Sequence, residues 1–161
     1  MFSDETLDRA ARLIRVATDA GVMIATVESC TGGLIAGAIT SVAGSSAAFE
    51  RGFVTYTNEA KIEVVGVPKI ILNTHGAVSA ETAIAMAEGG LEICPADLSV
   101  GVTGVAGPGG GTPEKPVGTV AIAVAHRGKP SVCKIPRFDG DRTAVRLATV
   151  DQALEMMLAM L

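Results

Sequence analysis

The 161-residue sequence predicts one α/β domain, with helices covering a mixed β-sheet in a three-layer-like arrangement. Two observations support this prediction. Short apolar, β-branched segments alternate with segments of helical periodicity, which favours parallel strands, and one pair of apolar segments is joined by a tight turn typical of an antiparallel hairpin. No internal repeat or linker interrupts the pattern, so residues 1–161 are expected to form a single domain.

The first expected element is a helix that Ser3 caps and Gly21 ends, because apolar residues recur between them at helical spacing. Residues 22–27 are apolar and rich in β-branched side chains, which predicts a buried strand. The other elements expected in this half are a helix over 34–39 that starts near Thr31, a loop at 42–46, a strand at 52–56 and a helix at 58–65.

In the second half, Ser79 is typical of a helix N-cap, and Asp141 is expected to cap the last helix. The turn at 126–129 should join the two strands of the hairpin. The remaining elements are strands at 98–102, 117–125 and 132–135, a loop rich in glycine and proline at 103–116, and an apolar stripe on the last helix formed by Leu147, Val150, Leu154, Met157 and Leu161.

Composition and charge argue against several classes of function. The chain has 13 Lys and Arg against 17 Asp and Glu, and only 3% aromatic residues, which disfavours nucleic acid as the main partner. Its 3 cysteines show no CxxC spacing, which predicts reduced thiols in the cytoplasm. We expect neither a signal peptide nor a membrane segment, and the absence of an HExxH motif or Cys/His cluster predicts no metal site.

The turn at residues 28–33 (ESCTGG) links the first expected strand to a helix. Ser29 would present its hydroxyl at the carboxyl edge of the sheet, and the N–H groups of Thr31, Gly32 and Gly33 could hold an oxyanion or a phosphate. The same residues could instead form only a capping turn. Cys30 is a second candidate nucleophile, although a small buried apolar residue is the simpler interpretation.

A serine nucleophile needs a base, and the chain has only 2 histidines. His126 is expected in a solvated hairpin turn and His75 in a loop, and no nucleophile-elbow motif supports a Ser-His triad. Lys61 and Tyr56 could point to one place, but a lysine acts as a base only where burial or a nearby positive charge lowers its pKa. Judged alone, Lys61 is more simply a solvated helix residue, and Tyr56 an ordinary strand aromatic.

The loop at residues 103–111 (TGVAGPGGG) can present backbone N–H groups to an anion. It matches neither the Walker A pattern nor the dinucleotide-binding pattern, so a flexible surface connection is the alternative. Lys115 and Arg142 could contact a phosphate, but an arginine in the first turn of a helix is more often solvated.

Seven short segments occur in a characteristic order and spacing: 28–33 (ESCTGG), 44–46 (GSS), 52–56 (GFVTY), 58–61 (NEAK), 76–79 (GAVS), 103–108 (TGVAGP) and 115–120 (KPVGTV). Together they resemble the CinA C-terminal domain family, of the stand-alone nicotinamide-nucleotide amidohydrolase (NMN deamidase) type. The resemblance extends from about residue 5 to the end of the chain, with small departures at Val27 and at residues 42–44.

The resemblance implies that the chain hydrolyses nicotinamide mononucleotide to nicotinic acid mononucleotide and ammonia in pyridine nucleotide salvage, without metal or cofactor. It places the nucleophile on Ser29 and the family's lysine and tyrosine on Lys61 and Tyr56. A neutral, partly buried Lys61 would take the proton of Ser29, and Tyr56 would relay or orient it. The residues expected to bind the oxyanion or the substrate are Thr31, Gly32, Gly33, Ser46, Thr103, Gly104, Ala106, Gly107 and Arg142.

Two other functions stay open at this point. The chain could be a nucleotide-binding module without catalysis, linked to competence or a damage response, or an amidase for another phosphorylated substrate. The apolar helix face of residues 145–161 could serve the core or a subunit interface, and we expect a homo-oligomer that binds a small nucleotide, with no nucleic-acid or membrane partner.

Overall fold

A five-stranded mixed sheet forms the middle layer of the computed structural model, which describes residues 2–161. The strands lie in the order β2-β1-β3-β4-β5; β1 is parallel to both β2 and β3, whereas the β3–β4 and β4–β5 pairs are antiparallel. The mixed sheet and its hairpin are therefore as predicted. The strands are β1 (Ile24–Glu28), β2 (Phe49–Val54), β3 (Leu98–Gly104), β4 (Val120–His126) and β5 (Val132–Lys134).

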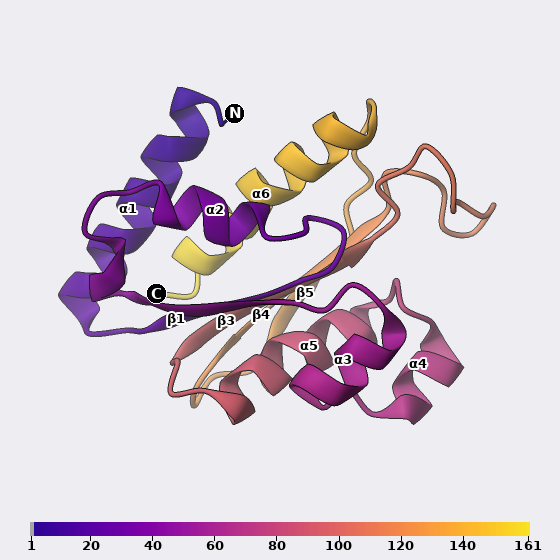
Figure 1. Ribbon diagram of the computed structural model, residues 1–161, viewed down its shortest axis with the longest axis horizontal. Coiled ribbons are helices and arrows are strands. Elements are labelled where there is room, and N and C mark those ends of the chain that lie inside the picture. The colour runs from indigo at the N-terminus through magenta and orange to yellow at the C-terminus, as the bar shows by residue number, and fades with distance from the viewer. Residues whose placement is uncertain (1) are drawn as a thin grey trace.

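Helices cover both faces of the sheet, which confirms the predicted three-layer α/β arrangement (Figure 1). One face carries α1 (Asp4–Ala20), α2 (Leu34–Thr40) and α6 (Arg142–Leu158), and the other carries α3 (Asn58–Val65), α4 (Lys69–His75) and α5 (Ala80–Ile93). A short 3-10 helix, η1 (Ser45–Ala47), precedes β2. No helix within residues 2–161 combines the length and apolarity needed to cross a lipid bilayer.

Side-chain caps start the long helices where the sequence predicts them. The hydroxyl of Ser3 accepts from the N–H of Thr6, that of Ser79 from the N–H of Thr82, and the carboxylate of Asp141 from the N–H of Ala144. These bonds satisfy helix N–H groups that have no partner within the helix. Gly21 ends α1 in the left-handed conformation, as expected.

Several element boundaries differ from the prediction. Helix α2 begins at Leu34 and not near Thr31, because Gly32 and Gly33 both have positive φ, which no helical residue adopts. Strand β4 begins at Val120 and not at 117, because Gly118, at φ 93°, turns the chain before the ladder starts. Strand β2 runs over 49–54 instead of 52–56, since Ile24 already pairs with Phe49.

Residues 69–75 form helix α4, although His75 was expected in a loop. Pro68 stands immediately before the first residue of this helix and fixes its own φ near the value that a helix start needs. Gly76, at φ 79°, ends the helix. The segment lacks a polar side-chain cap, so no sequence pattern indicated where a helix would start there.

Small side chains let α5 lie very close to the sheet. A cluster under this face consists largely of alanines, including Ala25, Ala83, Ala87, Ala121 and Ala123. Gly101 of β3 faces the helix, and a Cβ atom there would lie 2.4 Å from the carbonyl oxygen of Ala83. This close approach fixes α5, and α3 and α4 pack on α5 in turn.

We predict that Gly101→Ala destabilises the domain by about 2 kcal/mol or more, because the added methyl group must push α5 away from β3. Urea unfolding followed by circular dichroism measures the change. Gly109→Ala is the control, since nothing lies within 4 Å of a Cβ at that position, and it should change stability by less than about 0.5 kcal/mol. Equal stability of the two variants would contradict the tight α5–β3 packing.

Candidate active site

The carboxyl ends of the three parallel strands β1, β2 and β3 meet at one edge of the sheet. Backbone hydrogen bonds hold the residues that follow these strands: the N–H of Ser29 donates to Val102 O, and the N–H of Thr55 donates to Glu28 O. A cavity of about 200 Å³ opens at this edge. Its lining consists of Ser29, Cys30, Tyr56, Asn58, Lys61, Ala77, Val78, Thr103, Gly104, Ala106 and Arg142.

Lys61 lies at the bottom of this cavity, with only 1% of its surface exposed. Its Nζ atom is 3.2 Å from Ser29 Oγ and donates to the carbonyl oxygen of Thr55 at 3.1 Å. Thr57 caps α3 and so places Lys61 in the first turn of that helix, directly beyond the end of β2. The structure thus brings together the serine and the lysine that the sequence placed in different segments.

Burial lowers the pKa of Lys61 below its ordinary value, because an ammonium group loses its hydration there. Within residues 2–161, no carboxylate oxygen lies within ion-pair distance of its Nζ atom. No ion pair on the described chain therefore offsets the loss of hydration. A neutral amine beside a serine hydroxyl can accept the hydroxyl proton, which is the property that a general base needs.

Glu28, the last residue of β1, is fully buried and holds the start of α2. One carboxylate oxygen accepts from the N–H groups of Gly33 and Ile35, both at 3.0 Å, and the other accepts from Ala36 N–H at 2.8 Å. Sequence reasoning missed this role, although a glutamate at the end of an otherwise apolar, buried strand was a signal. The three bonds fix the direction in which the turn leaves the sheet.

The N–H groups expected to hold an anion divide into two kinds. Gly33 N–H donates to Glu28, and Gly32 N–H donates to Ser29 O at 3.0 Å, so both close the turn itself. The N–H groups of Cys30 and Thr31 have no hydrogen-bond partner among the described residues. Cys30 lines the cavity, whereas Thr31 is fully buried and does not, so the N–H of Cys30 is the donor of this turn that a ligand can reach.

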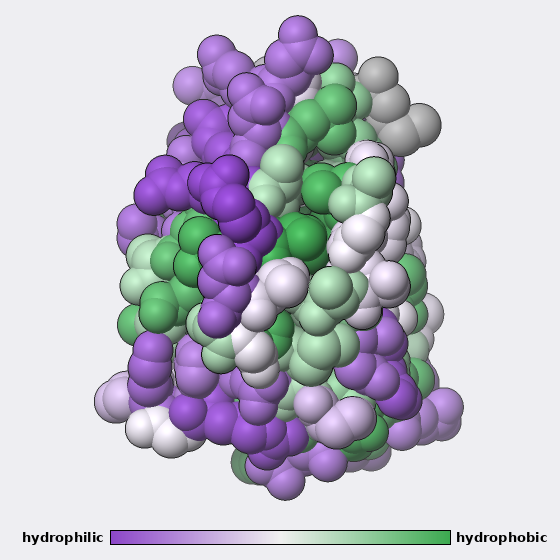
Figure 2. Space-filling model, turned by 90° about the vertical axis from the view of Figure 1, so that its left-hand side faces the viewer, coloured by the Kyte–Doolittle hydropathy of each residue, from purple (hydrophilic) through white to green (hydrophobic). Residues whose placement is uncertain are grey.

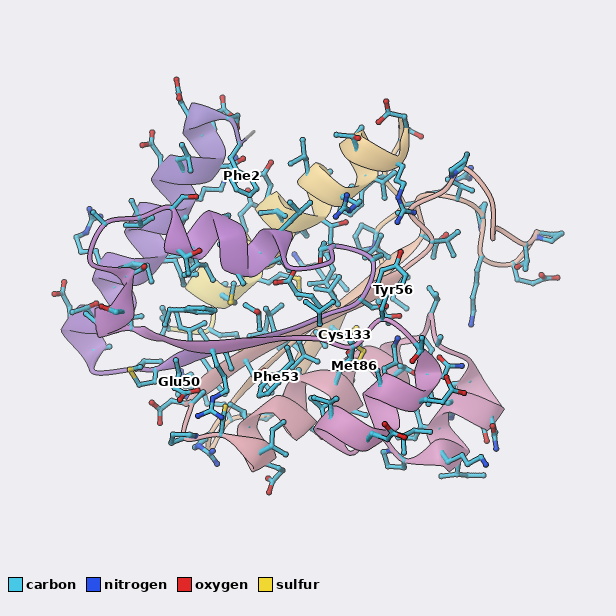
Figure 3. The ribbon with its side chains drawn as sticks, in the orientation of Figure 1. Phe2, Glu50, Phe53, Tyr56, Met86 and Cys133 are labelled. Atoms are coloured by element: carbon cyan, nitrogen blue, oxygen red, sulfur yellow. The ribbon has the colours of Figure 1, made fainter. Side chains whose placement is uncertain are left out.

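Tyr56 lies at the mouth of the cavity, with 56% of its surface exposed (Figure 3). Its hydroxyl accepts from Arg142 Nη2 at 2.8 Å, and Arg142 Nη1 donates to Gly107 O at 2.8 Å. Only the main-chain carbonyl of Tyr56 approaches Lys61, at 3.5 Å. The phenol thus contacts Arg142, and the relay expected between Tyr56 and the serine–lysine pair has no hydrogen bond within the described chain.

The loop at 103–107 borders the cavity as expected, but Ser46 does not. Thr103, Gly104 and Ala106 line the cavity. Gly107 does not line it, but its carbonyl oxygen accepts a hydrogen bond from Arg142, which does. Ser46 lies in η1, before β2, where Ala48 O accepts from the N–H at the start of β1. This is the opposite end of the sheet, shown in Figure 2 as a mixed surface of hydrophilic and apolar residues.

The other candidate nucleophile and bases do not fit this chemistry. Cys30 is 5% exposed, and burial raises the pKa of its thiol to about 11, which keeps it protonated and weakly nucleophilic. His75 Nδ1 lies 3.4 Å from Glu81 Oε1, and His126 contacts the carbonyl of Arg127; neither ring lines the cavity. In residues 2–161, no three His, Cys, Asp or Glu side chains gather as metal ligands would.

The fold and the site define an α/β domain with a buried serine–lysine pair at the carboxyl edge of a mixed sheet. A family model described as the CinA C-terminal domain matches residues 7–161. The chain belongs to this family.

Comparison with individual proteins gives similarity along almost the whole chain. A CinA-like protein of Citrifermentans bemidjiense is 51% identical over 156 residues, which are 96% of this chain but 36% of that protein. The chain therefore spans little more than a third of such relatives. The nicotinamide-nucleotide amidohydrolase PncC of Escherichia coli is 49% identical over 137 residues, 85% of this chain and 83% of that one.

A solved structure supports the fold. The crystal structure of the competence/damage inducible protein CihA from Agrobacterium tumefaciens matches with a TM-score of 0.96 at 51% identity. The match covers 99% of this chain and 97% of that one. The arrangement of sheet and helices described above is therefore that of an experimentally determined family member.

We predict that Glu28→Gln destabilises the domain by about 2 to 3 kcal/mol. In the wild type both carboxylate oxygens accept hydrogen bonds from backbone N–H groups, and in the variant the amide NH₂, which is itself a donor, must face one of these N–H groups. Thermal and urea unfolding measure the loss. Glu88→Gln is the matched control: its carboxylate accepts only from the exposed Ser131 hydroxyl, and the change should stay within about 0.5 kcal/mol. An unaltered stability of Glu28→Gln would show that the carboxylate does not anchor α2.

Proposed function

We propose that the domain hydrolyses the carboxamide of nicotinamide mononucleotide to nicotinic acid mononucleotide and ammonia, with Ser29 as the nucleophile and Lys61 as its base. The observation that carries the proposal is the 3.2 Å contact between Lys61 Nζ and Ser29 Oγ, made by a lysine that is 1% exposed. The similarity to the E. coli amidohydrolase, which extends over 85% of this chain, supports this choice of substrate. The proposed chemistry needs no metal or cofactor and would serve pyridine nucleotide salvage.

In the first half of the reaction, neutral Lys61 takes the hydroxyl proton while Ser29 Oγ bonds to the carboxamide carbon. The carbonyl oxygen becomes an oxyanion, to which the free N–H of Cys30 would donate a hydrogen bond. Donors of this kind contribute about 3 to 4 kcal/mol each in comparable sites. Collapse of the tetrahedral intermediate breaks the C–N bond, and the proton held by Lys61 leaves with the amide nitrogen as ammonia.

In the second half, water attacks the acyl-enzyme and transfers a proton to Lys61 as it does so. The new tetrahedral intermediate collapses, Ser29 Oγ leaves the carbon, and Lys61 returns the proton to it. The acid product is released and the site is restored. Each half therefore uses the same lysine first as a base and then as an acid.

The mouth of the cavity suits a substrate with a phosphate. Arg142, held by the hydroxyl of Tyr56 and the carbonyl of Gly107, places a positive charge beside the cavity. A phosphate group would pair with this guanidinium. The pyridinium charge of the substrate would also disfavour a second positive charge on Lys61, which supports its neutral form.

We predict that the purified protein releases ammonia from nicotinamide mononucleotide with or without a chelator, and that Ser29→Ala lowers kcat by about 10⁴-fold or more. Below the pKa of Lys61, kcat/KM should rise with pH, because only the deprotonated amine can accept the serine proton. A coupled ammonia assay measures each rate. Cys30→Ala is the control and should retain activity, since its thiol stays protonated.

Full activity in Ser29→Ala would exclude the proposed nucleophile. Tight binding of the nucleotide without turnover would instead support a binding module without catalysis. Turnover of other phosphorylated carboxamides in preference to nicotinamide mononucleotide would keep the mechanism and change the substrate.

A further inference from the structure

Arg146 of α6 contacts the main chain immediately after the nucleophile. Its Nε donates to the carbonyl oxygen of Cys30 at 3.0 Å, and its Nη2 donates to that of Thr31 at 2.8 Å. Within residues 2–161, no carboxylate oxygen lies within ion-pair distance of this guanidinium. A half-buried cation is thus held against two successive peptide carbonyls of the ESCTGG turn.

These two bonds determine which way the neighbouring N–H groups point. The C=O and N–H of a trans peptide unit point in opposite directions. The carbonyl of Cys30 shares its peptide unit with the N–H of Thr31, so a guanidinium on that carbonyl holds the N–H facing the other way. Thr31 is fully buried and does not line the cavity, so this bond fixes the turn from its buried side.

The second carbonyl fixes the next peptide unit. The carbonyl of Thr31 shares its unit with the N–H of Gly32, which closes the turn onto Ser29 O at 3.0 Å. Arg146 therefore sets the orientation of both peptide units that follow Cys30. The carbonyl of Ser29 shares its own peptide unit with the N–H of Cys30, which lines the cavity and has no partner within the described chain. A donor on a carbonyl also polarises its peptide unit, so the bonds from Arg146 and Gly32 make the Cys30 N–H a stronger donor to an anion.

The first glycine of the motif leaves room for this contact. Gly32 has φ 59°, and a Cβ atom there would lie 3.3 Å from Arg146 Nη2. A larger residue at this position would both strain the backbone and press on the guanidinium. The sequence thus pairs a glycine in the turn with an arginine on a distant helix.

We propose that Arg146 is a positioning residue that holds the Thr31–Gly32 peptide and, through the bond from Gly32 N–H, the Ser29–Cys30 peptide, so that Cys30 N–H donates to the oxyanion formed at Ser29. The inference rests on the proposed function in needing Ser29 as the nucleophile, but it does not depend on nicotinamide mononucleotide as the substrate. Arg146 is absent from the lining of the cavity, so its effect on the reaction passes through the turn.

The test compares Arg146→Met and Arg146→Lys with the wild type in two assays. The first is steady-state release of ammonia from nicotinamide mononucleotide. The second is the rate at which an alkyl fluorophosphonate labels Ser29, followed by intact-protein and peptide mass spectrometry. In the labelling step Ser29 Oγ bonds to phosphorus, fluoride leaves, and Lys61 takes the hydroxyl proton; negative charge develops on the phosphoryl oxygen, which needs the same donor.

Arg146→Met should lower both kcat and the labelling rate by about 10²-fold, as expected for the loss of one oxyanion donor. KM should change by less than about 3-fold, because ground-state binding does not use this peptide in the same way. Arg146→Lys should recover part of the rate, because an ammonium group reaches one carbonyl and cannot span both. Arg9→Met is the matched control. Arg9 of α1 forms ion pairs with Asp151 and Glu155 of α6, the helix that carries Arg146, and both rates should stay at wild-type values.

A labelling rate in Arg146→Met equal to that of the wild type would overturn the inference. The inference would also be overturned if Arg146→Met had a lower melting temperature but an unchanged kcat per folded molecule. If Arg146→Met does not fold, a lowered kcat in Arg146→Lys at wild-type melting temperature supports the inference, and an unchanged kcat overturns it. A wild type that is labelled on Ser29 but inactive on nicotinamide mononucleotide contradicts only the proposed substrate, and the labelling rates still decide the role of Arg146. A wild type that reacts in neither assay overturns both proposals.

Discussion

The burial of the Lys61 amine against Ser29 is the constraint on which the rest of the site depends. A charged lysine in a protein interior costs several kcal/mol unless an opposite charge or many polar groups replace its water. Its two closest contacts are the Ser29 hydroxyl and the Thr55 carbonyl, and neither carries a charge. The fold therefore favours a neutral amine, which is the state that can take a proton from serine.

The charged groups near the pair are each held by main-chain groups, and this keeps them away from the lysine. The carboxylate of Glu28 accepts three N–H groups of the turn and of α2, and the guanidinium of Arg146 donates to two carbonyls of the turn. An ion pair between Glu28 and Lys61 would stabilise the ammonium form and remove the base. The same contacts that shape the turn thus leave Lys61 without an ionic partner.

The sequence predicted those features of the fold and of the site that depend on residues close together in the chain. The caps at Ser3, Ser79 and Asp141, the mixed sheet with its hairpin, and the turn that carries Ser29 all follow from short patterns. The features that it did not predict depend on distant contacts. The burial of Lys61 requires β2 to end, and α3 to begin, beside the end of β1. The hydrogen bond from Arg142 to Tyr56 joins residues 86 positions apart. Only the resemblance pointed to Ser46 as a site residue, and the sheet register shows that it lies at the opposite end of the sheet.

The pKa of Lys61 itself decides whether the serine has a neutral base. NMR titration of protein labelled with ¹³C at the lysine Cε atoms measures it, with Lys61→Met to assign the resonance. Because burial disfavours the ammonium form, Lys61 is expected to titrate clearly below its ordinary value of 10.5. A Lys61 resonance that titrates at 10.5 or above would contradict a neutral amine beside Ser29.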